Sequence, residues 1–385
     1  MKHSSSPKHT QSSNNTPIKR ASTCKKVLFR IAIALMALVG VLCIVVGGFA
    51  LHLLNKVNYV PDEPYDPNAT LSPDMTEPED TLPSDPNTEP PSLSDEQKQE
   101  ALVYDSFQSI GEIPVRGNEE GIRNILLLGI DGNSYVGRSD TMIVLSINDN
   151  TKTIKMVSLL RDGWVPIPGR DRDKDGKYDV EKLNASYAFG RFALLRKTIR
   201  ENYRLDIDEF VGVNFKVLPI LIDKMGGIDM ELTAKAMTQI PTATSKEEYA
   251  SIGFSPLTGD PGVYHLSGFQ ALQYMRIRKI DSEYKRTERQ RKVLAHLIEK
   301  AKTMNYFELV DVISTALSHV STNMTSGEFL GFASNAMKYT SYSIKNDQQM
   351  PQKGLCEVYY IGRSSGIRSK DPVACVNKLH EYIYG

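Results

Sequence analysis

The chain has few of the residues on which several common enzyme classes depend. Its 385 residues include seven histidines and four cysteines, and none is spaced as a zinc-ligand pair or placed with serine as a nucleophile and its base. It also has no glycine-rich loop of the Walker or dinucleotide-binding type, and no internal repeat. The single tryptophan, Trp164, is interpreted as a packing residue rather than a sugar platform. These absences argue against zinc enzymes, serine or cysteine hydrolases, and enzymes with either nucleotide-binding loop.

Net charge is absent too, because 46 basic and 46 acidic residues cancel, but the charges are unevenly distributed. Residues 1–30 hold seven Lys or Arg and no carboxylate, which predicts a basic, disordered tail. Residues 31–54 are apolar except for His52 and are long enough to cross a bilayer as one helix. The basic flank predicts a single-pass anchor with a cytoplasmic N-terminus and an extracytoplasmic remainder. A signal peptide cleaved near Ala50 is the alternative, although the apolar run is longer than usual for one.

The chain beyond this span divides by composition into a linker and a folded domain. Residues 55–105 are rich in proline and acidic residues and predict an extended spacer. Residues 106–385 are predicted to form the folded domain. In an extracytoplasmic compartment Cys356 and Cys375 can form a disulfide, and two free thiols remain the open alternative, because the sequence does not reveal their geometry. Nucleic-acid binding is not expected, since the basic tail is short and the domain lies across the membrane from it.

Three short apolar runs predict consecutive strands, over residues 124–130, 142–147 and 153–160. The gaps between them are too short for a crossover helix, so the strands are expected to be antiparallel neighbours. The first strand then ends at Asp131, the second starts at Asp140, and the third returns to end at Arg161. These side chains therefore meet at one edge of the sheet, with Arg138 on the connecting loop.

Helical and strand-like segments alternate in the rest of the chain, which predicts an α/β layered domain. The expected elements are helices at 186–203, from 216 to Gly226-Gly227, and at 305–320, 325–339 and 373–384, and strands at 210–213, 228–232 and 358–361. Ser267 and Gln270 form a capping-box pattern that begins a short helix. That helix leads into a segment, 274–279, whose two arginines share a face if it is extended. A long helix from Tyr284 carries further polar side chains on one side.

Two kinds of charged residue give the sequence its chemistry. Asp131 and Asp140 at a sheet edge are suited to bind a magnesium ion, which prefers one or two acidic ligands plus phosphate oxygens. Turn formation is a commoner role for aspartates that flank a loop. Guanidinium groups bind phosphate bidentately and keep their charge. The candidate phosphate ligands are Arg138, Arg161, Arg276, Arg278 and Arg286. A solvated basic face, ion-paired to Asp162, Asp281 and Glu288, is the alternative interpretation.

Several motifs in one order resemble the LytR-CpsA-Psr family. They are NILLLGID at 124–131, GRSDTM at 137–142, VSLLRD at 157–162, KLNASYAFG at 182–190, GGID at 226–229, RIRKID at 276–281 and RTERQ at 286–290. The resemblance covers roughly residues 122–305 and includes the single N-terminal anchor. It implies a three-layer mixed sheet flanked by helices.

The resemblance also implies an activity. Such proteins transfer an anionic glycopolymer, of the teichoic acid or capsular polysaccharide type, from a polyprenyl-pyrophosphate carrier in the membrane to peptidoglycan, without ATP. By motif position, Asp131 and Asp140 hold Mg²⁺, with Mn²⁺ as the alternative ion. The pyrophosphate ligands implied in the same way are Arg138, Arg161, Arg276, Arg278, Arg286 and Gln290. Asp140 and Asp162 are the candidates for the base that takes the proton of the attacking hydroxyl.

Two other functions fit the same residues. If water replaces the sugar hydroxyl, the chain is a polyprenyl-pyrophosphate hydrolase. If no bond is broken, it is a carrier-lipid binding or regulatory protein of the cell envelope.

An acidic run at 171–179 departs from these motifs. Asp171, Asp173, Asp175 and Asp179 have the spacing of ligands in a calcium loop. An EF-hand requires Glu at its twelfth position, and Lys182 stands there instead. Calcium binding and an ordinary solvated acidic turn are both consistent with this sequence.

Overall fold

The computed structural model describes residues 57–61, 65–68, 93–130, 139–214, 217–278, 280–328, 331 and 335–385. The tail and the membrane span predicted at 1–30 and 31–54 lie outside these residues, as do Asp131 and Arg138. Within the described ranges, no helix is both long enough and apolar enough to cross a membrane.

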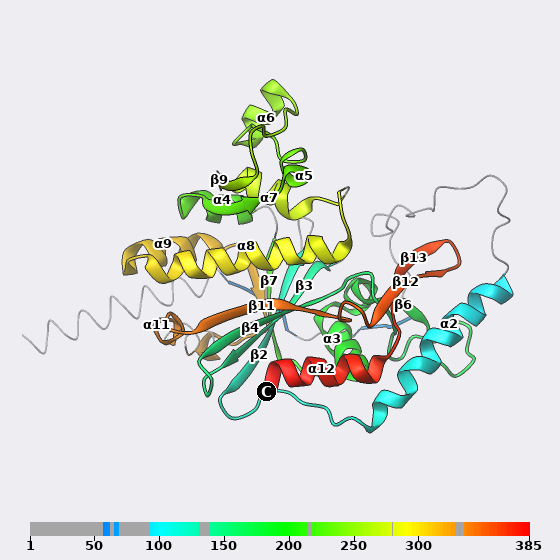
Figure 1. The fold of residues 1–385 in the computed structure, drawn as a ribbon. Helices are drawn as coiled ribbons and strands as arrows, with labels where there is room; N and C mark the ends of the chain where they lie inside the picture. Colours follow the sequence, from blue (N-terminus) through cyan, green and yellow to red (C-terminus); the bar gives the residue numbers. More distant parts are fainter. Residues whose placement is uncertain are drawn as a thin grey trace, which may run out of the picture. The chain divides into compact units, whose positions relative to one another are not determined.

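A seven-stranded mixed sheet forms the centre of the domain (Figure 1). Its strands, in spatial order, are β1 (Asn58–Tyr59), β10 (Val320–Thr322), β7 (Glu209–Asn214), β2 (Ile122–Ile130), β3 (Ser139–Asn148), β4 (Thr153–Leu159) and β11 (Ser343–Met350). Strands β2, β3 and β4 are antiparallel neighbours, which confirms the predicted pairing. Strand β7 runs parallel to β2, and β11 runs parallel to β4. The sheet is therefore mixed.

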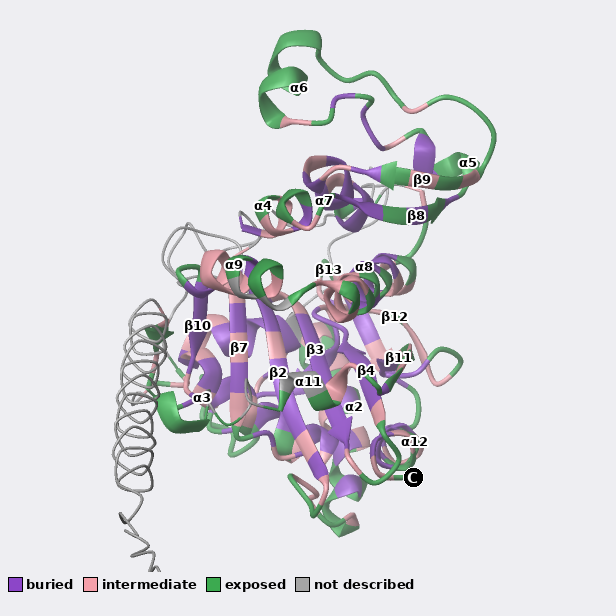
Figure 2. Ribbon diagram, turned by 90° about the vertical axis from the view of Figure 1, so that its left-hand side faces the viewer, coloured by how far each residue is buried: buried purple, intermediate pink, exposed green. Residues whose placement is uncertain are grey.

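Helices cover both faces of this sheet, so the domain has three layers. On one face Leu126 and Val144 pack with helices α2 (Leu93–Gln108), α3 (Leu183–Tyr203) and α12 (Pro372–Tyr384). On the other face Ile125 and Ile143 pack against Ala295 of α8 (Glu283–Thr303). Successive strand residues point to opposite faces, so these strands must be apolar throughout. Figure 2 shows β2, β3 and β4 mostly in the colour of buried residues.

A second group of elements packs on the side of α8 that faces away from the sheet. It comprises α4 (Val217–Lys224), β8 (Ile228–Leu232), α5 (Ala234–Met237), α6 (Lys246–Ile252), β9 (Gly262–Leu266) and α7 (Gly268–Arg276), with α9 (Tyr306–Leu317) beside α4. Met230, Tyr274 and Val293 belong to its apolar cluster. The capping box of Ser267 and Gln270 begins α7 as predicted. Helix α8 is thus buried between two cores, which fixes its position.

The folded part begins earlier than residue 106, where the sequence analysis placed it. Helix α2 occupies the end of the predicted spacer, and its Val103 and Phe107 are buried in the main core. Strand β1 also pairs with β10. The sequence pattern concealed α2, because most of its residues are polar and its buried side chains are few.

The remaining elements are short and lie outside the central sheet. They are the 3-10 turn Ser109–Glu112, strands β5 (Trp164–Pro166), β6 (Val180–Lys182), β12 (Cys356–Ile361) and β13 (Ser364–Ser369), and helix α11 (Ala336–Tyr339). Strand β11 was not predicted, since it lies at a sheet edge and most of its residues are polar. Two residues, Gly190 and Arg191, have non-helical backbone angles and kink α3.

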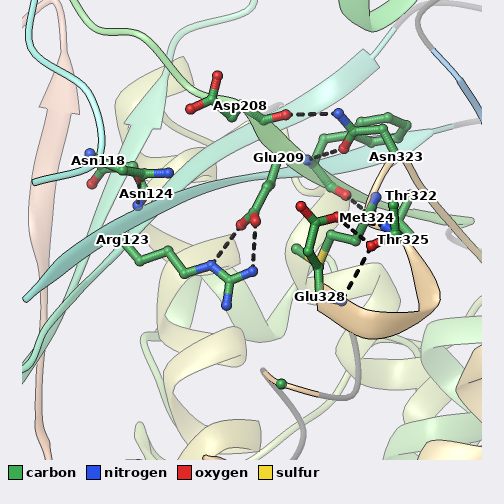
Figure 3. A network of polar contacts seen from close by, with 12 residues as sticks. Asn118, Arg123, Asn124, Asp208, Glu209, Thr322, Asn323, Met324, Thr325 and Glu328 are labelled. Carbon is green, nitrogen blue, oxygen red and sulfur yellow. Dashed lines mark hydrogen bonds and ion pairs between the residues drawn. The ribbon is translucent and has the colours of Figure 1, made fainter.

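The start of β2 and β7 is held by a polar network (Figure 3). Arg123 donates two hydrogen bonds to Glu209, at 2.7 and 2.6 Å. The Asn323 side chain accepts from the Phe210 backbone N–H at 3.0 Å and donates to the Asp208 carbonyl at 2.7 Å. This network aligns the two parallel strands at the end of the sheet opposite Asp140.

Candidate functional site

The candidate site lies where β2 ends, β3 begins and β4 ends. The strand register places Ile130 opposite Ser139, and Met142 opposite Leu159. Asp140 and Arg161 therefore reach the same edge of the sheet, and Arg161 Nη1 lies 2.5 Å from Asp140 Oδ1. The strand pairing predicted from the sequence required this proximity.

Arg161 is a buried guanidinium surrounded by acids. Its side chain is 7% exposed. Its Nε lies 3.2 Å from Asp162 Oδ2 and 3.8 Å from Glu283 Oε1. Lys182, at the end of β6, lies 3.7 Å from the other oxygen of Asp162. A charged cluster is therefore assembled from three strand ends and the start of α8.

Helix α8 brings a second buried guanidinium to this cluster. Arg286 donates a hydrogen bond to Glu283, one turn earlier, and is 3% exposed. Burial lowers the pKa of Arg286, and the positive charges of Arg161 and Arg278 lower it further. These two arginines are therefore close enough to Arg286 to repel it. A site that holds several guanidinium groups against their mutual repulsion is suited to a polyanion.

Several buried polar atoms at this edge lack a hydrogen bond. Within the described residues, Thr141 Oγ1, Asp162 Oδ1, Arg286 Nε and Gln290 Oε1 are buried and make none. Native interiors satisfy most such groups, so a concentration of them indicates a bound ligand or ordered water. Gln290 is 5% exposed and lies one turn after Arg286 on α8, where the helical spacing predicted it.

The other predicted arginines lie at the connection between α7 and α8. Arg276 is the last residue of α7, so residues 274–276 are helical and the condition of an extended segment, under which the two arginines would share a face, is not met there. Arg276 and Arg278 are exposed and flank the buried Ile277. Arg289 instead binds Asp281 at 2.6 Å and the Ile277 carbonyl at 2.6 Å, which fastens this connection.

Glu283 was not among the site residues predicted from the sequence. Burial raises the pKa of Glu283 above its usual value, and the charge of Asp162 adds to this effect, while Arg286 and Arg161 oppose it. Its position three residues before Arg286, in the first turn of a helix, was the available signal. The sequence could not reveal that Arg161 would lie beside it.

The acidic run forms an exposed turn. Carboxylate oxygens of Asp171, Asp173 and Asp175 lie within 4.8 Å of one another. Asp171 accepts hydrogen bonds from the backbone N–H groups of Asp175 and Gly176, at 3.1 and 3.2 Å. Asp179 instead accepts a hydrogen bond from an arginine side chain. The turn thus gathers three of the four predicted ligands, and calcium binding stays a prediction.

The two cysteines of the domain are free thiols in the structure. Cys356 Sγ lies 2.8 Å from the Tyr284 hydroxyl, and Cys375 Sγ lies 3.2 Å from Ser369 Oγ. Burial raises the pKa of both thiols. Of the two alternatives left open by the sequence, the structure has the unbridged one.

Comparison with known families assigns the chain. Residues 88–369 match the model of the LytR_cpsA_psr family. The chain belongs to the LytR-CpsA-Psr family. The chain is 33% identical over 255 residues to the polyisoprenyl-teichoic acid–peptidoglycan teichoic acid transferase TagU of Enterococcus faecalis, covering 64% of this chain and 76% of that protein. It is 30% identical over 241 residues to biofilm regulatory protein A of Streptococcus mutans, covering 58% of this chain and 56% of that protein.

Two solved structures have a similar fold. The crystal structure of Bacillus subtilis TagV aligns with a TM-score of 0.52 at 25% identity, over 69% of this chain and 98% of that one. The protein gbs0355 of Streptococcus agalactiae aligns with a TM-score of 0.55 at 27% identity, over 69% and 88% of the two chains. The predicted α/β fold with a central mixed sheet is confirmed.

Proposed function

We propose that this LytR-CpsA-Psr protein is a phosphotransferase that moves an anionic glycopolymer from a polyprenyl-pyrophosphate carrier to peptidoglycan. The observation that carries the proposal is the pair of buried guanidinium groups, Arg161 and Arg286, which Glu283 connects at the sheet edge. Beside them lie buried polar atoms that make no hydrogen bond among the described residues. Relatives in Enterococcus faecalis and Bacillus subtilis are named as transferases of teichoic acid to peptidoglycan, which supports the same reaction here.

The site residues suit each part of this reaction. A hydroxyl oxygen of a peptidoglycan sugar attacks the phosphorus next to the glycopolymer, and the bond from that phosphorus to the polyprenyl phosphate breaks. The hydroxyl proton passes to one of the two candidate carboxylate bases. Arg161 and Arg286 bind the pyrophosphate oxygens and stabilise the charge that develops on the leaving phosphate. Gln290 supplies a neutral amide at the same edge. Arg278 and Arg276 are exposed and extend the positive charge toward solvent.

We propose Mg²⁺ as the metal, with Mn²⁺ as the alternative, held by Asp131 and Asp140. Asp140 fits this role, because Arg161 engages one of its oxygens and we find no partner for the other oxygen within the described residues. Its side chain is 27% exposed, so a hydrated ion can reach it. The ion would neutralise charge on the phosphate oxygens.

The location follows from the substrate. We propose that residues 31–54 anchor the chain and that the domain acts outside the cytoplasm, where a lipid-linked polymer meets peptidoglycan. Protease treatment of intact cells is expected to release the domain, whereas a domain protected until lysis contradicts this orientation.

The test is transfer of a labelled polyprenyl-pyrophosphate-linked saccharide to peptidoglycan fragments by the purified chain, with and without magnesium. Wild type is compared with Arg161→Ala and with Arg200→Ala, an exposed arginine of α3 that serves as the matched control. Metal-dependent label in peptidoglycan, lost only in Arg161→Ala, supports the proposal. Free saccharide phosphate instead indicates a hydrolase. Label that stays on the lipid in every sample indicates a carrier-lipid binding or regulatory protein.

A further inference from the structure

Glu283 is a single carboxylate between two buried guanidinium groups. It accepts a hydrogen bond from Arg286 Nη2, and its Oε1 lies 3.8 Å from Arg161 Nε. Its side chain is 17% exposed. Acids are common in the first turn of a helix, where they interact with the backbone dipole. Glu283 has a more specific arrangement, because its carboxylate connects an arginine from the end of β4 to an arginine of α8.

Charged side chains from several elements lie in the cluster around Glu283. Among the described residues, the cations are Arg161 after β4, Lys182 at the end of β6, Arg278 before α8 and Arg286 on α8. The anions are Asp140 on β3, Asp162 after β4 and Glu283 itself. Four cations and three anions leave one positive charge. A pyrophosphate diester brings two negative charges, so in the absence of a divalent metal ion its arrival reverses the sign of this cluster.

Burial and the neighbouring Asp162 already raise the pKa of Glu283, and Arg286 and Arg161 are the groups that oppose the rise. A phosphate that binds these two arginines draws them away from the carboxylate and adds a negative charge beside it. Both changes raise the pKa of Glu283 further. Protonation then removes the repulsion between carboxylate and phosphate.

We propose that Glu283 holds the guanidinium groups of Arg161 and Arg286 in place before substrate binds, and takes up a proton when a pyrophosphate replaces it as their counter-ion. This inference rests on the proposed function, because it requires a pyrophosphate at these arginines. The proton passes from a buffer acid to a carboxylate oxygen of Glu283, and no other bond changes. Glu283 is a positioning residue, since it acts through the two arginines.

The test measures proton uptake on binding. Geranylgeranyl pyrophosphate, without divalent metal, is titrated calorimetrically into the purified chain in two buffers of different ionisation enthalpy. Wild type is compared with Glu283→Gln, which mimics the protonated carboxyl, and with the control Glu288→Gln. Bonds from Lys285 and Lys292 lower the pKa of Glu288 to about 2, so Glu288 does not titrate in the same range.

Wild type and Glu288→Gln are expected to take up as much as about one proton more than Glu283→Gln. For each unit rise in pH, the affinity of these two proteins for geranylgeranyl pyrophosphate is then expected to fall by a factor up to about ten times larger than the factor for Glu283→Gln. Equal proton uptake by wild type and Glu283→Gln, with both binding, overturns the role of Glu283 and leaves the proposed function standing. Absence of binding to wild type without metal overturns the role of Glu283, and absence of binding when Mg²⁺ is added as well also counts against the proposed function.

A second measurement covers a Glu283→Gln chain that does not fold. Infrared difference spectra of wild type, with and without the same ligand, are expected to gain a protonated carboxyl band. In Glu283→Asp that band is expected to shift. A spectrum with no such band overturns the proposal.

Discussion

Replacing Arg161 with methionine tests whether this guanidinium holds the charged cluster together. The substitution keeps an apolar side chain in the space but leaves Asp140, Asp162 and Glu283 without their shared counter-ion. Removing one partner of a buried ion pair destabilises a protein by about 3–5 kcal/mol. We expect the lower end, about 3 kcal/mol, because the Asp140 side chain keeps 27% exposure to water and Lys182 still faces Asp162.

The decrease in the free energy of unfolding caused by Arg161→Met is expected to depend on pH. Arg161 lowers the pKa of Glu283, so its removal raises a pKa that burial has already raised. The Glu283 carboxylate of the folded variant then binds a proton more tightly than it does in the unfolded chain, where the pKa of a glutamate is near 4.5. Lowering the pH toward that value therefore favours the folded state of the variant. The difference in the free energy of unfolding between wild type and Arg161→Met becomes smaller. Each unit of added pKa shift corresponds to about 1.4 kcal/mol.

Urea unfolding can be followed by the fluorescence of Trp164, which is 4% exposed and lies close to Arg161 in the chain. Titrations at about pH 8 and about pH 5.5 are compared for wild type, Arg161→Met and the exposed control Arg200→Met, which is expected to lose less than about 1 kcal/mol. An unchanged free energy of unfolding at the higher pH, or a difference that widens as the pH falls, would refute the reasoning.

Three further predictions concern other parts of the domain. Gln290→Leu keeps the volume of a buried side chain but removes its amide. We expect transfer of the labelled saccharide to slow about 10- to 100-fold, with no decrease in the urea midpoint of unfolding. An unchanged transfer rate contradicts the proposed role of Gln290 as a pyrophosphate ligand. Arg123→Met removes two hydrogen bonds to Glu209 and is expected to lower the free energy of unfolding by about 1–3 kcal/mol while transfer continues. Glu288→Gln is expected to be less stable than wild type at neutral pH, because the depressed pKa of Glu288, about 2, stabilises the folded state fully above the unfolded value of 4.5. In acid titrations the difference in the free energy of unfolding should shrink below pH 4.5 and vanish as the pH falls toward 2.

The candidate site was predicted in part. The closeness of Asp140 and Arg161 followed from strand pairing, because two short gaps left no room for a crossover. Helical spacing put Arg286 and Gln290 on one side of α8, and the family resemblance implied their role as ligands. Glu283 was missed, since its neighbour Arg161 is distant in the chain. The motifs placed these residues in a family but could not reveal their contacts.

The sequence by itself determined the features that depend on neighbouring residues. Apolar runs with short gaps produced the antiparallel β2–β3–β4 unit, and the Ser267 and Gln270 side chains began α7 by local capping. Tertiary structure decided the parallel pairing of β7 and β11 with that unit, the burial of α2, and the contact of Glu283 with two arginines. Such contacts join segments that are distant in the chain, and they depend on burial and charge pairing. The secondary-structure propensity of neighbouring residues contributes little to them.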